Sequence, residues 1–229
     1  MIELYTWPTP NGQKVQILLE ECGLPYSVHP IDIQNGDQFK PEFLAISPNN
    51  KMPALVDTEG PGGRYSLFES GAILWYLAEK TGQFMSKDPA KRYDTLQWIM
   101  FQMASVGPML GQLGHFRHYA PEKIEYALNR YSNEAKRLYG VVDRRLTGRD
   151  YVVDQYSIAD MAIYPWFAGH ERQGIAIDGF PNVKAWTERL KARPAVQKGM
   201  ALLTEKRRTG PMDDKAKQNL FGAAQYVRR

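Results

Sequence analysis

Two polar side chains near the N-terminus are the strongest candidates for chemistry. Thr9 offers a hydroxyl and Asn11 an amide, just before residues 14–21, whose apolar side chains recur at a period of about 3.6. The start of such a helix has unpaired N–H groups and the positive end of the helix dipole, which favour an anion. A hydroxyl donor at this position would therefore help to stabilise a bound anion. A plain helix cap is an equally good interpretation of Thr9 or Asn11, and spacing alone leaves both interpretations open.

Other candidates for the same role are weaker. Tyr5 and Thr6 also carry hydroxyls, but Tyr5 lies inside a predicted strand. The one cysteine of the chain, Cys22, lies well past the start of the helix and is interpreted as a small core residue. A single cysteine excludes an internal disulfide and a CxxC motif, and it fits a reducing compartment.

A second group of residues describes an edge suited to an extended peptide. Residues 54–57 and 65–68 are short runs separated by a glycine-rich turn, which is the pattern of a hairpin. Pro53 stands at the start of the first run, where it removes one donor from the strand ladder. If the Met52–Pro53 bond is cis, the Met52 main chain turns outward and can pair with a bound peptide in antiparallel fashion. A cis proline that only shapes a turn is the alternative.

Charged and capping residues flank that edge. Ser70 falls near the N-cap of the helix predicted for residues 72–80, so a carboxylate is favoured beside it. Glu69 can take an ammonium group, and Lys51 can hold a second carboxylate. A site that binds a carboxylate beside a site that binds an ammonium group would together bind the terminus of an α-amino acid. Each residue also has an ordinary interpretation, as a helix cap or a solvated surface charge.

The elements that must position these residues follow in a regular order. The predicted strands are residues 2–6, residues 26–32 and the two runs of the hairpin, and the predicted helices are residues 14–21, 40–44 and 72–80. Pro30 places the second strand at a sheet edge. This β-α-β-α-β-β-α order is the thioredoxin-like arrangement, an α/β fold. From residue 88 onward the patterns are helical, which predicts an all-helical second domain.

The helical half of the chain offers structural signals rather than chemistry. Ser157 stands three residues before Asp160, a capping-box spacing, and its loss should cost about 1 kcal/mol of folding free energy. His115 and His118 have no carboxylate or cysteine cluster nearby, so they do not make a metal site. Residues 210–229 are polar and basic, and form either a wrapped or a loose tail.

Composition limits the class of protein. The chain has 229 residues, 43% of them hydrophobic, which fits a soluble globular protein of one large or two modest domains. The net charge of +4 includes no run of five or more like charges, so a nucleic-acid partner has little support. No apolar segment approaches the roughly 18 residues that span a membrane, and the N-terminus lacks a signal-peptide pattern. These features predict a cytoplasmic protein without membrane contact.

Two segments together resemble the glutathione-binding motif of the glutathione transferase superfamily: SPNNKMPALVD at residues 47–57 and LFESGAILWYLAEKTG at residues 67–82. The similarity runs through most of the chain and points to the Nu class of bacterial proteins. It implies a thioredoxin-like N-terminal domain with a mixed four-stranded sheet, followed by an all-helical C-terminal domain. The implied boundaries are residues 1–83 for the glutathione-binding domain, 88–209 for the helical domain that lines the second-substrate pocket, and 210–229 for the tail.

The resemblance also implies roles for single residues. Thr9 and Asn11 would be catalytic, and the Met52–Pro53 bond would be cis. Glutathione would be bound by six residues: Gln38, Lys51, Met52, Glu69, Ser70 and Arg130. Arg130 would reach the site from the partner subunit of a homodimer. The mouth of the second-substrate pocket would be lined by Gln97, Trp98, residues 107–112, His115 and Phe116, although core packing is the ordinary interpretation of Trp98 and Met109.

The implied activity is the reduction of small disulfides by a bound glutathione thiolate, with glutathione disulfide as the product. Weak transferase or peroxidase activity would accompany it. Two alternatives stay open: conjugation of apolar electrophiles by the same thiolate, and a non-catalytic glutathione-binding module. The presence of Thr9, Asn11, Glu69 and Ser70 speaks against the module. Glutathione would be a co-substrate without a metal, and the other partners would be glutathione disulfide and a small disulfide or electrophile.

Overall fold

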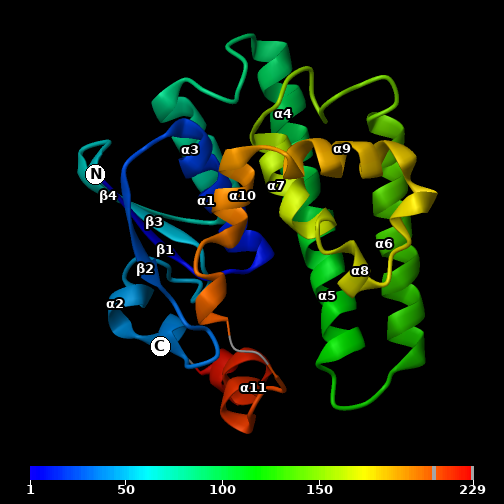
Figure 1. Cartoon of the computed structure of the whole chain (residues 1–229). Coiled ribbons are helices and arrows are strands. Elements are labelled where there is room, and N and C mark those ends of the chain that lie inside the picture. The colour runs from blue at the N-terminus through cyan, green and yellow to red at the C-terminus, as the bar shows by residue number, and fades with distance from the viewer. Residues whose placement is uncertain (208–209, 228–229) are drawn as a thin grey trace. The chain divides into compact units, whose positions relative to one another are not determined.

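A computed structural model describes residues 1–207 and 210–227 of the chain (Figure 1). The contacts between residues divide it into two compact units. The sheet unit comprises Met1–Ile73 together with Lys198–Arg229, and the helical unit comprises Leu74–Gln197. Each unit is described by itself.

The sheet unit contains a mixed four-stranded sheet, as predicted. Its strands are β1 (Ile2–Thr6), β2 (Tyr26–Pro30), β3 (Ala54–Gly60) and β4 (Gly63–Phe68), in the spatial order β2-β1-β3-β4. Strand β1 pairs with β2 in parallel and with β3 in antiparallel fashion, and β3 and β4 form the predicted hairpin. Pro30 therefore ends an edge strand, where the missing N–H of proline is tolerated.

Helix α1 (Pro10–Cys22) packs against the sheet because its sequence places apolar side chains on one face. Thr9 caps its start, Pro10 occupies the first turn, and Gly23 ends it in the left-handed conformation with φ of 63°. Four of its apolar residues are fully buried: Val15, Ile17, Leu18 and Leu19. Burial of each such side chain stabilises the unit by roughly 1.5–3 kcal/mol. The shorter elements η1 (Asp37–Phe39) and α2 (Pro41–Leu44) lie between β2 and β3 in the chain, and α3 (Ser70–Thr81) begins directly after β4.

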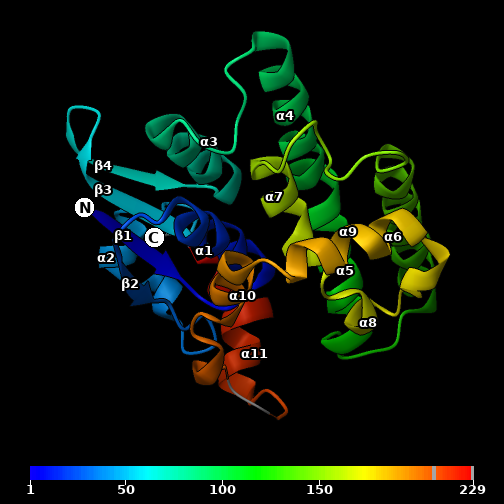
Figure 2. The same cartoon turned by 45° about the horizontal axis from the view of Figure 1, so that its top comes forward.

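The last part of the chain returns to the sheet unit. It contains the end of α10 (Pro194–Ala201), η4 (Thr204–Lys206), α11 (Asp214–Phe221) and η5 (Ala223–Tyr226), drawn in orange and red in Figures 1 and 2. Gly199 lies so close to α1 that a Cβ atom there would stand 2.6 Å from the Ile17 nitrogen. In the tail itself, Lys215 donates to Asn35 and Asn219 donates to the carbonyl oxygen of Gln34, both at 2.8 Å, so its described part is a wrapped segment. Arg228 and Arg229 lie outside the described residues.

The regular elements of the helical unit are all helices, as predicted. They are α4 (Pro89–Phe101), the π-helical turn η2 (Gln102–Val106), α5 (Gly107–His118), α6 (Glu125–Arg145), α7 (Ile158–Phe167), α8 (His170–Gln173), η3 (Ile177–Gly179) and α9 (Pro181–Lys191), with most of α3 and the start of α10. Helix α6 is strongly amphipathic and buries Ala135, Leu138, Tyr139 and Val142. Within the described residues, no helix is long and apolar enough to cross a membrane.

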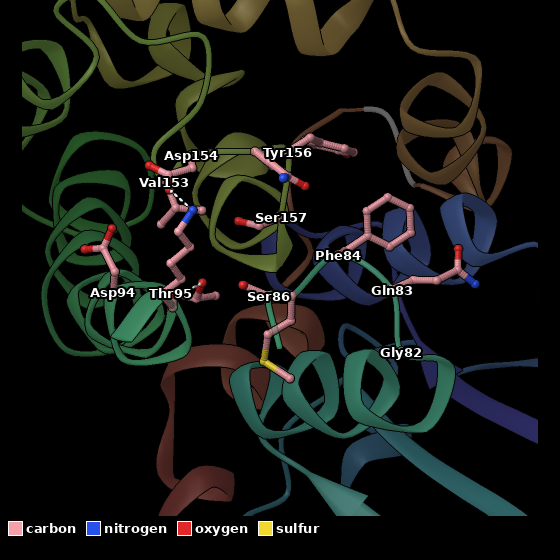
Figure 3. Close-up of a pocket in the computed structure, with 13 residues that line it drawn as sticks. Gly82, Gln83, Phe84, Ser86, Asp94, Thr95, Val153, Asp154, Tyr156 and Ser157 are labelled. Carbon is pink, nitrogen blue, oxygen red and sulfur yellow. Dashed lines mark hydrogen bonds and ion pairs between the residues drawn. The ribbon is translucent and has the colours of Figure 1, made fainter. Parts of the chain in front are cut away.

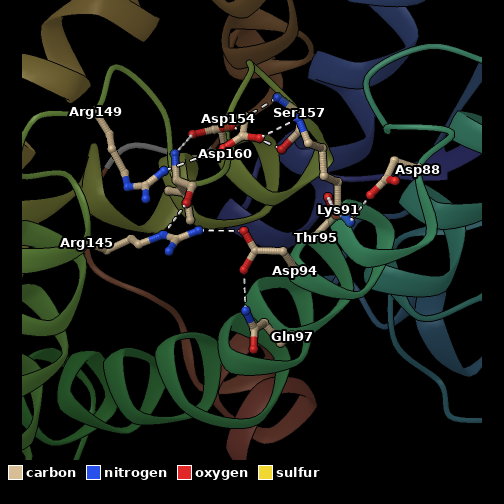
Figure 4. Close-up of polar contacts among 11 residues, drawn as sticks. Asp88, Lys91, Asp94, Thr95, Gln97, Arg145, Arg149, Asp154, Ser157 and Asp160 are labelled. Carbon is tan, nitrogen blue, oxygen red and sulfur yellow. Dashed lines mark hydrogen bonds and ion pairs between the residues drawn. The ribbon is translucent and has the colours of Figure 1, made fainter.

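A buried polar cluster fixes the start of α7 (Figure 4). The predicted capping box is present, because the Ser157 hydroxyl accepts from the N–H of Ala159 at 3.2 Å and Asp160 accepts from the N–H of Ser157 at 3.0 Å. Asp160 also accepts from the N–H of Val152 and from the Trp186 indole, both at 2.9 Å. Burial raises the pKa of Asp160 to about 6, and these donors act in the opposite direction. Ser157 and Asp160 are therefore structural residues.

Candidate functional site

Thr9 stands at the junction of the loop and α1 with its hydroxyl directed at the peptide edge. Its backbone is extended, and its oxygen accepts from the N–H of Gly12 at 3.4 Å, a long capping contact. The same hydroxyl donates to the sulfur of Met52 at 3.7 Å. A thioether sulfur is a weak acceptor, so a thiolate would be a stronger acceptor for this O–H. Thr9 is thus both a cap and an available donor.

Asn11 lies in the first turn of α1 and is partly exposed. The loop before this turn, which ends at Thr9, is held close to it. A Cβ atom at Gly12 would lie 2.3 Å from the Trp7 carbonyl oxygen and 2.6 Å from Thr6 Oγ1, so only glycine fits. This close approach fixes where Thr9 and Asn11 stand relative to the helix N-terminus.

Met52 provides main-chain groups beside Thr9. The Met52–Pro53 bond is cis, as predicted, and Pro53 directly precedes β3. Within the described residues, no main-chain hydrogen bond involves the N–H or the C=O of Met52. The side chain of Met52 packs on the small apolar cluster of Ile31, Phe43 and Ala54. Met52 is therefore anchored by its side chain while its peptide groups stay available to an added strand.

Glu69 and Ser70 form the turn from β4 into α3. Glu69 has φ of 71°, a left-handed conformation that non-glycine residues seldom adopt, and its carboxylate accepts from Asn49 at 3.4 Å. The helix begins at Ser70 itself, so Glu69 rather than Ser70 takes the position just before the first helical residue. The carbonyl oxygen of Glu69 accepts from the N–H of Ile73 at 3.0 Å. The predicted carboxylate and ammonium subsites are therefore adjacent.

Lys14 was not among the predicted site residues, but it lies at this turn. Its amine donates to Ser70 Oγ at 3.2 Å, and its side chain is only 1% exposed. Burial lowers the pKa of Lys14 to about 7, and the negative charge of Glu69 acts in the opposite direction. Position 14 falls on the buried face of an amphipathic helix. That apolar pattern with one lysine inside it is the signal that could have identified the residue.

Gln38 and Lys51 both contact the C-terminal tail. The Gln38 amide donates to the carbonyl oxygens of Ile33 at 3.1 Å and Asn219 at 3.3 Å. Its own oxygen is buried and accepts no hydrogen bond from any described residue. Such an unmet acceptor costs roughly 1–3 kcal/mol.

The Lys51 amine donates to Gln225 Oε1 at 2.6 Å, and partial burial lowers its pKa. Gln225 in turn donates to the carbonyl oxygen of Asn219. An ammonium group has three donors, so this contact leaves room for a ligand carboxylate. The sequence did not predict these tail contacts, because they join residues more than 170 positions apart.

The remaining predicted residues lie in the helical unit. Arg130 is exposed on α6, where its charge helps to lower the pKa of Glu134, mainly an effect of Arg137. Trp98 stands edge-on to Phe101 with ring centroids 5.3 Å apart, and Phe116 stacks on Tyr131 at 5.5 Å. The contact of Trp98 fits its packing interpretation. The role of both aromatic residues at a second-substrate pocket stays a prediction.

The alternative hydroxyls have structural partners. Thr6 is fully buried and accepts from the Gln16 amide at 3.0 Å. Tyr5 stacks on His29 with centroids 4.6 Å apart, and its hydroxyl donates to Glu3 at 3.3 Å. Cys22 is the last residue of α1, at the end opposite Thr9. Among the candidates, Thr9 is the hydroxyl that lies at the helix N-terminus.

A cavity of about 410 Å³ lies within the helical unit (Figure 3). Phe84, Tyr156 and Ser157 line it, and Lys91 pairs with Asp154 at 2.8 Å in its wall. None of the predicted site residues lines this cavity. The three charged residues of its lining are all paired, because Asp154 binds Lys91 and Asp94 binds Arg145. The described residues also contain no group of three or more His, Cys, Asp or Glu side chains that could hold a metal ion.

Comparison with known families identifies the family and the fold of the chain. The chain matches the glutathione S-transferase N-terminal domain over residues 9–80 and the C-terminal domain over residues 103–194. It therefore belongs to the glutathione S-transferase family. The predicted family, enzyme class and fold class are confirmed.

Similar proteins include one from Escherichia coli (strain K12), named disulfide-bond oxidoreductase YfcG. The two chains are 52% identical over 206 residues, which cover 89% of this chain and 95% of that protein. A Pseudomonas putida glutathione transferase, with one glutathione disulfide bound per subunit, aligns with a TM-score of 0.85 and 50% identity over 88% of this chain and 91% of that one. A Burkholderia graminis glutathione transferase, with two glutathione molecules bound per subunit, aligns with a TM-score of 0.84 and 48% identity, covering 90% and 89% of the two chains.

Proposed function

We propose that this protein is a glutathione-dependent reductase of small disulfides. The observation that carries the proposal is the Thr9 hydroxyl, which lies at the N-terminus of α1 and within 3.7 Å of Met52 Sδ. A tripeptide bound along the Met52 main chain would bring its cysteine sulfur to this hydroxyl. The relative named disulfide-bond oxidoreductase and the relatives with glutathione or glutathione disulfide bound support this reaction.

The reaction consumes two glutathione molecules for each disulfide. The first thiolate attacks one sulfur of the substrate, so a mixed disulfide forms and one substrate thiolate leaves and is protonated. The second thiolate attacks the glutathione sulfur of the mixed disulfide, which forms glutathione disulfide and releases the other substrate thiolate. Two electrons pass from the two glutathiones to the substrate, and the two protons lost by the thiols end on the products. No thiol of the protein takes part.

Thr9 and Asn11 would stabilise the attacking thiolate. A thiol with an ordinary pKa of about 8.5 is mostly protonated at neutral pH. A hydrogen bond to a charged acceptor contributes roughly 1.5–3 kcal/mol, which corresponds to about one or two pKa units. One hydroxyl donor and a helix N-terminus are therefore sufficient to make the thiolate abundant near pH 7.

The other end of the tripeptide would be held at the turn into α3. Its α-carboxylate would accept from Ser70, and its ammonium would donate to Glu69. Gln38 would accept the ligand N–H that its buried oxygen lacks, and Lys51 would bind the glycine carboxylate. We further propose the domain boundaries at residues 1–83, 88–209 and 210–229, a homodimer in which Arg130 serves the partner subunit, and a cytoplasmic location. These parts rest on the resemblance of the sequence to the family.

The direct test is an assay of purified protein with glutathione and 2-hydroxyethyl disulfide, in which formation of glutathione disulfide is followed by coupled NADPH oxidation. The proposal expects turnover that depends on both substrates. A parallel assay with chlorodinitrobenzene measures conjugation. Conjugation that is much faster than reduction would favour the transferase alternative. Glutathione binding without either activity would favour a non-catalytic module and overturn the proposal.

A further inference from the structure

A buried lysine lies directly behind the turn that is proposed to hold the amino acid end of glutathione. Lys14 belongs to the second turn of α1, and only 1% of its surface is exposed. Its Nζ lies 3.2 Å from Ser70 Oγ, and Ser70 is itself 5% exposed. Both residues belong to the sheet unit. The contact therefore couples the interior of α1 to the first residue of α3.

Burial of an ammonium group destabilises the folded protein, so a buried lysine suggests that its charge has a function. Apolar residues surround this position on α1, since Val15, Ile17 and Leu18 are fully buried. Methionine or leucine would fill the same space without a desolvation cost. Residues that reduce stability in this way are found mostly at functional sites. A lysine at position 14 is therefore explained better by a role in ligand binding than by packing.

The direction of the hydrogen bond shows how Lys14 can act. An ammonium group has donors and no acceptor, so Ser70 Oγ must be the acceptor in this contact. The Ser70 proton is consequently directed elsewhere, towards an acceptor outside the pair. A carboxylate at the N-terminus of α3 would be such an acceptor, and the positive charge behind the hydroxyl would attract it.

We infer that Lys14 is a positioning residue for the α-carboxylate of bound glutathione, which acts through Ser70 and takes up a proton when the ligand binds. This inference rests on the proposed function, because it needs the amino acid end of the tripeptide at Ser70. The ligand class it defines is an α-amino acid terminus with a free carboxylate.

The charges around Lys14 determine whether ligand binding is linked to the uptake or to the release of a proton. Burial lowers the pKa of Lys14 to about 7 without ligand, and the charged group on the α3 side, Glu69, already acts against this shift. One helical turn away on α1, Pro10 and Leu18 carry no charge. A bound carboxylate raises the pKa further, so the complex binds more protons than the ligand-free protein. Affinity is then highest below pH 7 and falls as the pH rises through the pKa of the complex.

The experiment is calorimetric titration with S-methylglutathione between pH 6 and pH 8, in buffers of different ionisation enthalpy. This probe has no thiol, so thiolate formation cannot contribute protons. For a pKa rise of about one unit, the wild type should take up about half a proton per site at pH 7.5 and bind about fivefold more tightly at pH 6 than at pH 8. Lys14→Met should show no linked proton, nearly constant affinity across this range, and weaker binding at pH 6.

Thermal unfolding separates this role from a packing role. Lys14→Met removes a desolvated charge, so the ligand-free variant should melt about 3 °C higher than the wild type at pH 6 while it binds the probe less tightly. Lys14→Gln is the second variant, because it retains a donor for Ser70 but no charge. It too should lose the linked proton. Both variants keep every histidine of the chain, so histidine titration cancels in the comparison.

The outcomes are distinct. A wild-type protein that binds the probe without proton uptake, or a Lys14→Met variant with unchanged affinity at pH 6, would overturn the role of Lys14 while the proposed function stands. A wild-type protein that does not bind S-methylglutathione would overturn the proposed function as well.

Discussion

Thr9 joins two tasks that are often carried by separate residues. As the N-cap of α1 it accepts from Gly12, and as a donor it faces the sulfur of Met52. Capping needs the oxygen lone pairs, whereas thiolate stabilisation needs the proton, so the two tasks do not compete. The alternatives left open by the sequence, a cap or a donor, are therefore compatible in one side chain.

Replacement of this hydroxyl should lower turnover and leave binding intact. Thr9→Val keeps the shape but removes the donor to the thiolate, so kcat for 2-hydroxyethyl disulfide should fall about 10- to 100-fold, as expected for one hydrogen bond to a charged acceptor. Glutathione affinity measured by calorimetry should change less than about twofold, since the tripeptide is held mainly at other residues.

Thr9→Ser is the matched control, because it retains a hydroxyl and a cap. It should keep most of the activity. Equal turnover in the valine variant and the wild type would remove Thr9 from the mechanism.

At the scale of elements, the tail is the segment whose role the sequence did not reveal. Helix α11 and η5 supply the carbonyl oxygen of Asn219 to Gln38 and the amide oxygen of Gln225 to Lys51. The amide donors of Gln38 are thereby occupied, so its buried oxygen is the group that remains for the ligand N–H of the proposed site. Lys51 is held by one contact and retains further donors. The tail therefore orders two residues of the proposed glutathione site.

A chain that ends at Gly210 should bind glutathione about three- to tenfold more weakly, because loss of one or two ordering hydrogen bonds costs roughly 0.5–1.5 kcal/mol each. Gln225→Ala should reproduce part of the loss. Lys217→Ala is the control, since its recorded ion pair is with Asp214 inside the tail. Calorimetric titration measures all three. Tighter binding by the shortened chain would show instead that the tail competes with the ligand.

The cap of α7 is a second element with a defined energetic role. Ser157→Ala removes the hydroxyl that accepts from Ala159 and contacts Asp160, so the free energy of unfolding should fall by about 1 kcal/mol. Ser132→Ala, inside α6, should change it by less than about 0.5 kcal/mol. Denaturant unfolding gives both values. Specific activity per folded molecule should stay at the wild-type level in both, and a selective loss in Ser157→Ala would contradict its structural role.

Local patterns were sufficient to predict most of the strands and helices of the sheet unit. The apolar runs around the glycine-rich turn predicted the β3–β4 hairpin, and Pro30 predicted the edge position of β2. The cis bond before Pro53 was implied by the resemblance to the family, whereas the hairpin, the edge strand and the capping box at Ser157 were predicted from local patterns. These features depend on neighbours within a few positions, which is why a single sequence reveals them.

The features that were missed depend on distant neighbours. Lys14 was missed as a site residue because its partner Ser70 lies 56 positions away in the sequence. Gln38 and Lys51 meet residues of the tail across more than 170 positions. Helix α3 begins at Ser70, before the start predicted at residue 72. The residue in front of it is therefore Glu69, which adopts the left-handed conformation. Such contacts follow from tertiary packing rather than from local propensity.

At the scale of the whole molecule, the proposed site needs two chains. Arg130 lies in the helical unit and is exposed on α6, and the resemblance to the family assigns it to the partner subunit's site. An exposed arginine on a helix usually contributes little to stability. A contribution to glutathione binding would therefore be visible as a loss of affinity without a loss of folding.

Mixed dimers test this arrangement. Arg130→Ala should weaken glutathione binding about tenfold, as for a lost charge-assisted contact, whereas Arg137→Ala on the same helix should not. When Thr9→Val and Arg130→Ala subunits are mixed and allowed to exchange, one site in each mixed dimer regains both intact residues. Activity at low glutathione should then rise above the average of the two variants. No rise, with subunit exchange verified, would place Arg130 outside the partner's site.

The position of the tripeptide itself decides the central claim, and a crystal structure of the protein soaked with glutathione measures it directly. The account predicts an extended tripeptide that makes two main-chain hydrogen bonds of about 2.7–3.2 Å with Met52, its amino acid end at Glu69 and Ser70, and its sulfur in contact with the Thr9 hydroxyl. Glutathione bound away from β3, or a cysteine sulfur turned from Thr9 into solvent, would contradict it.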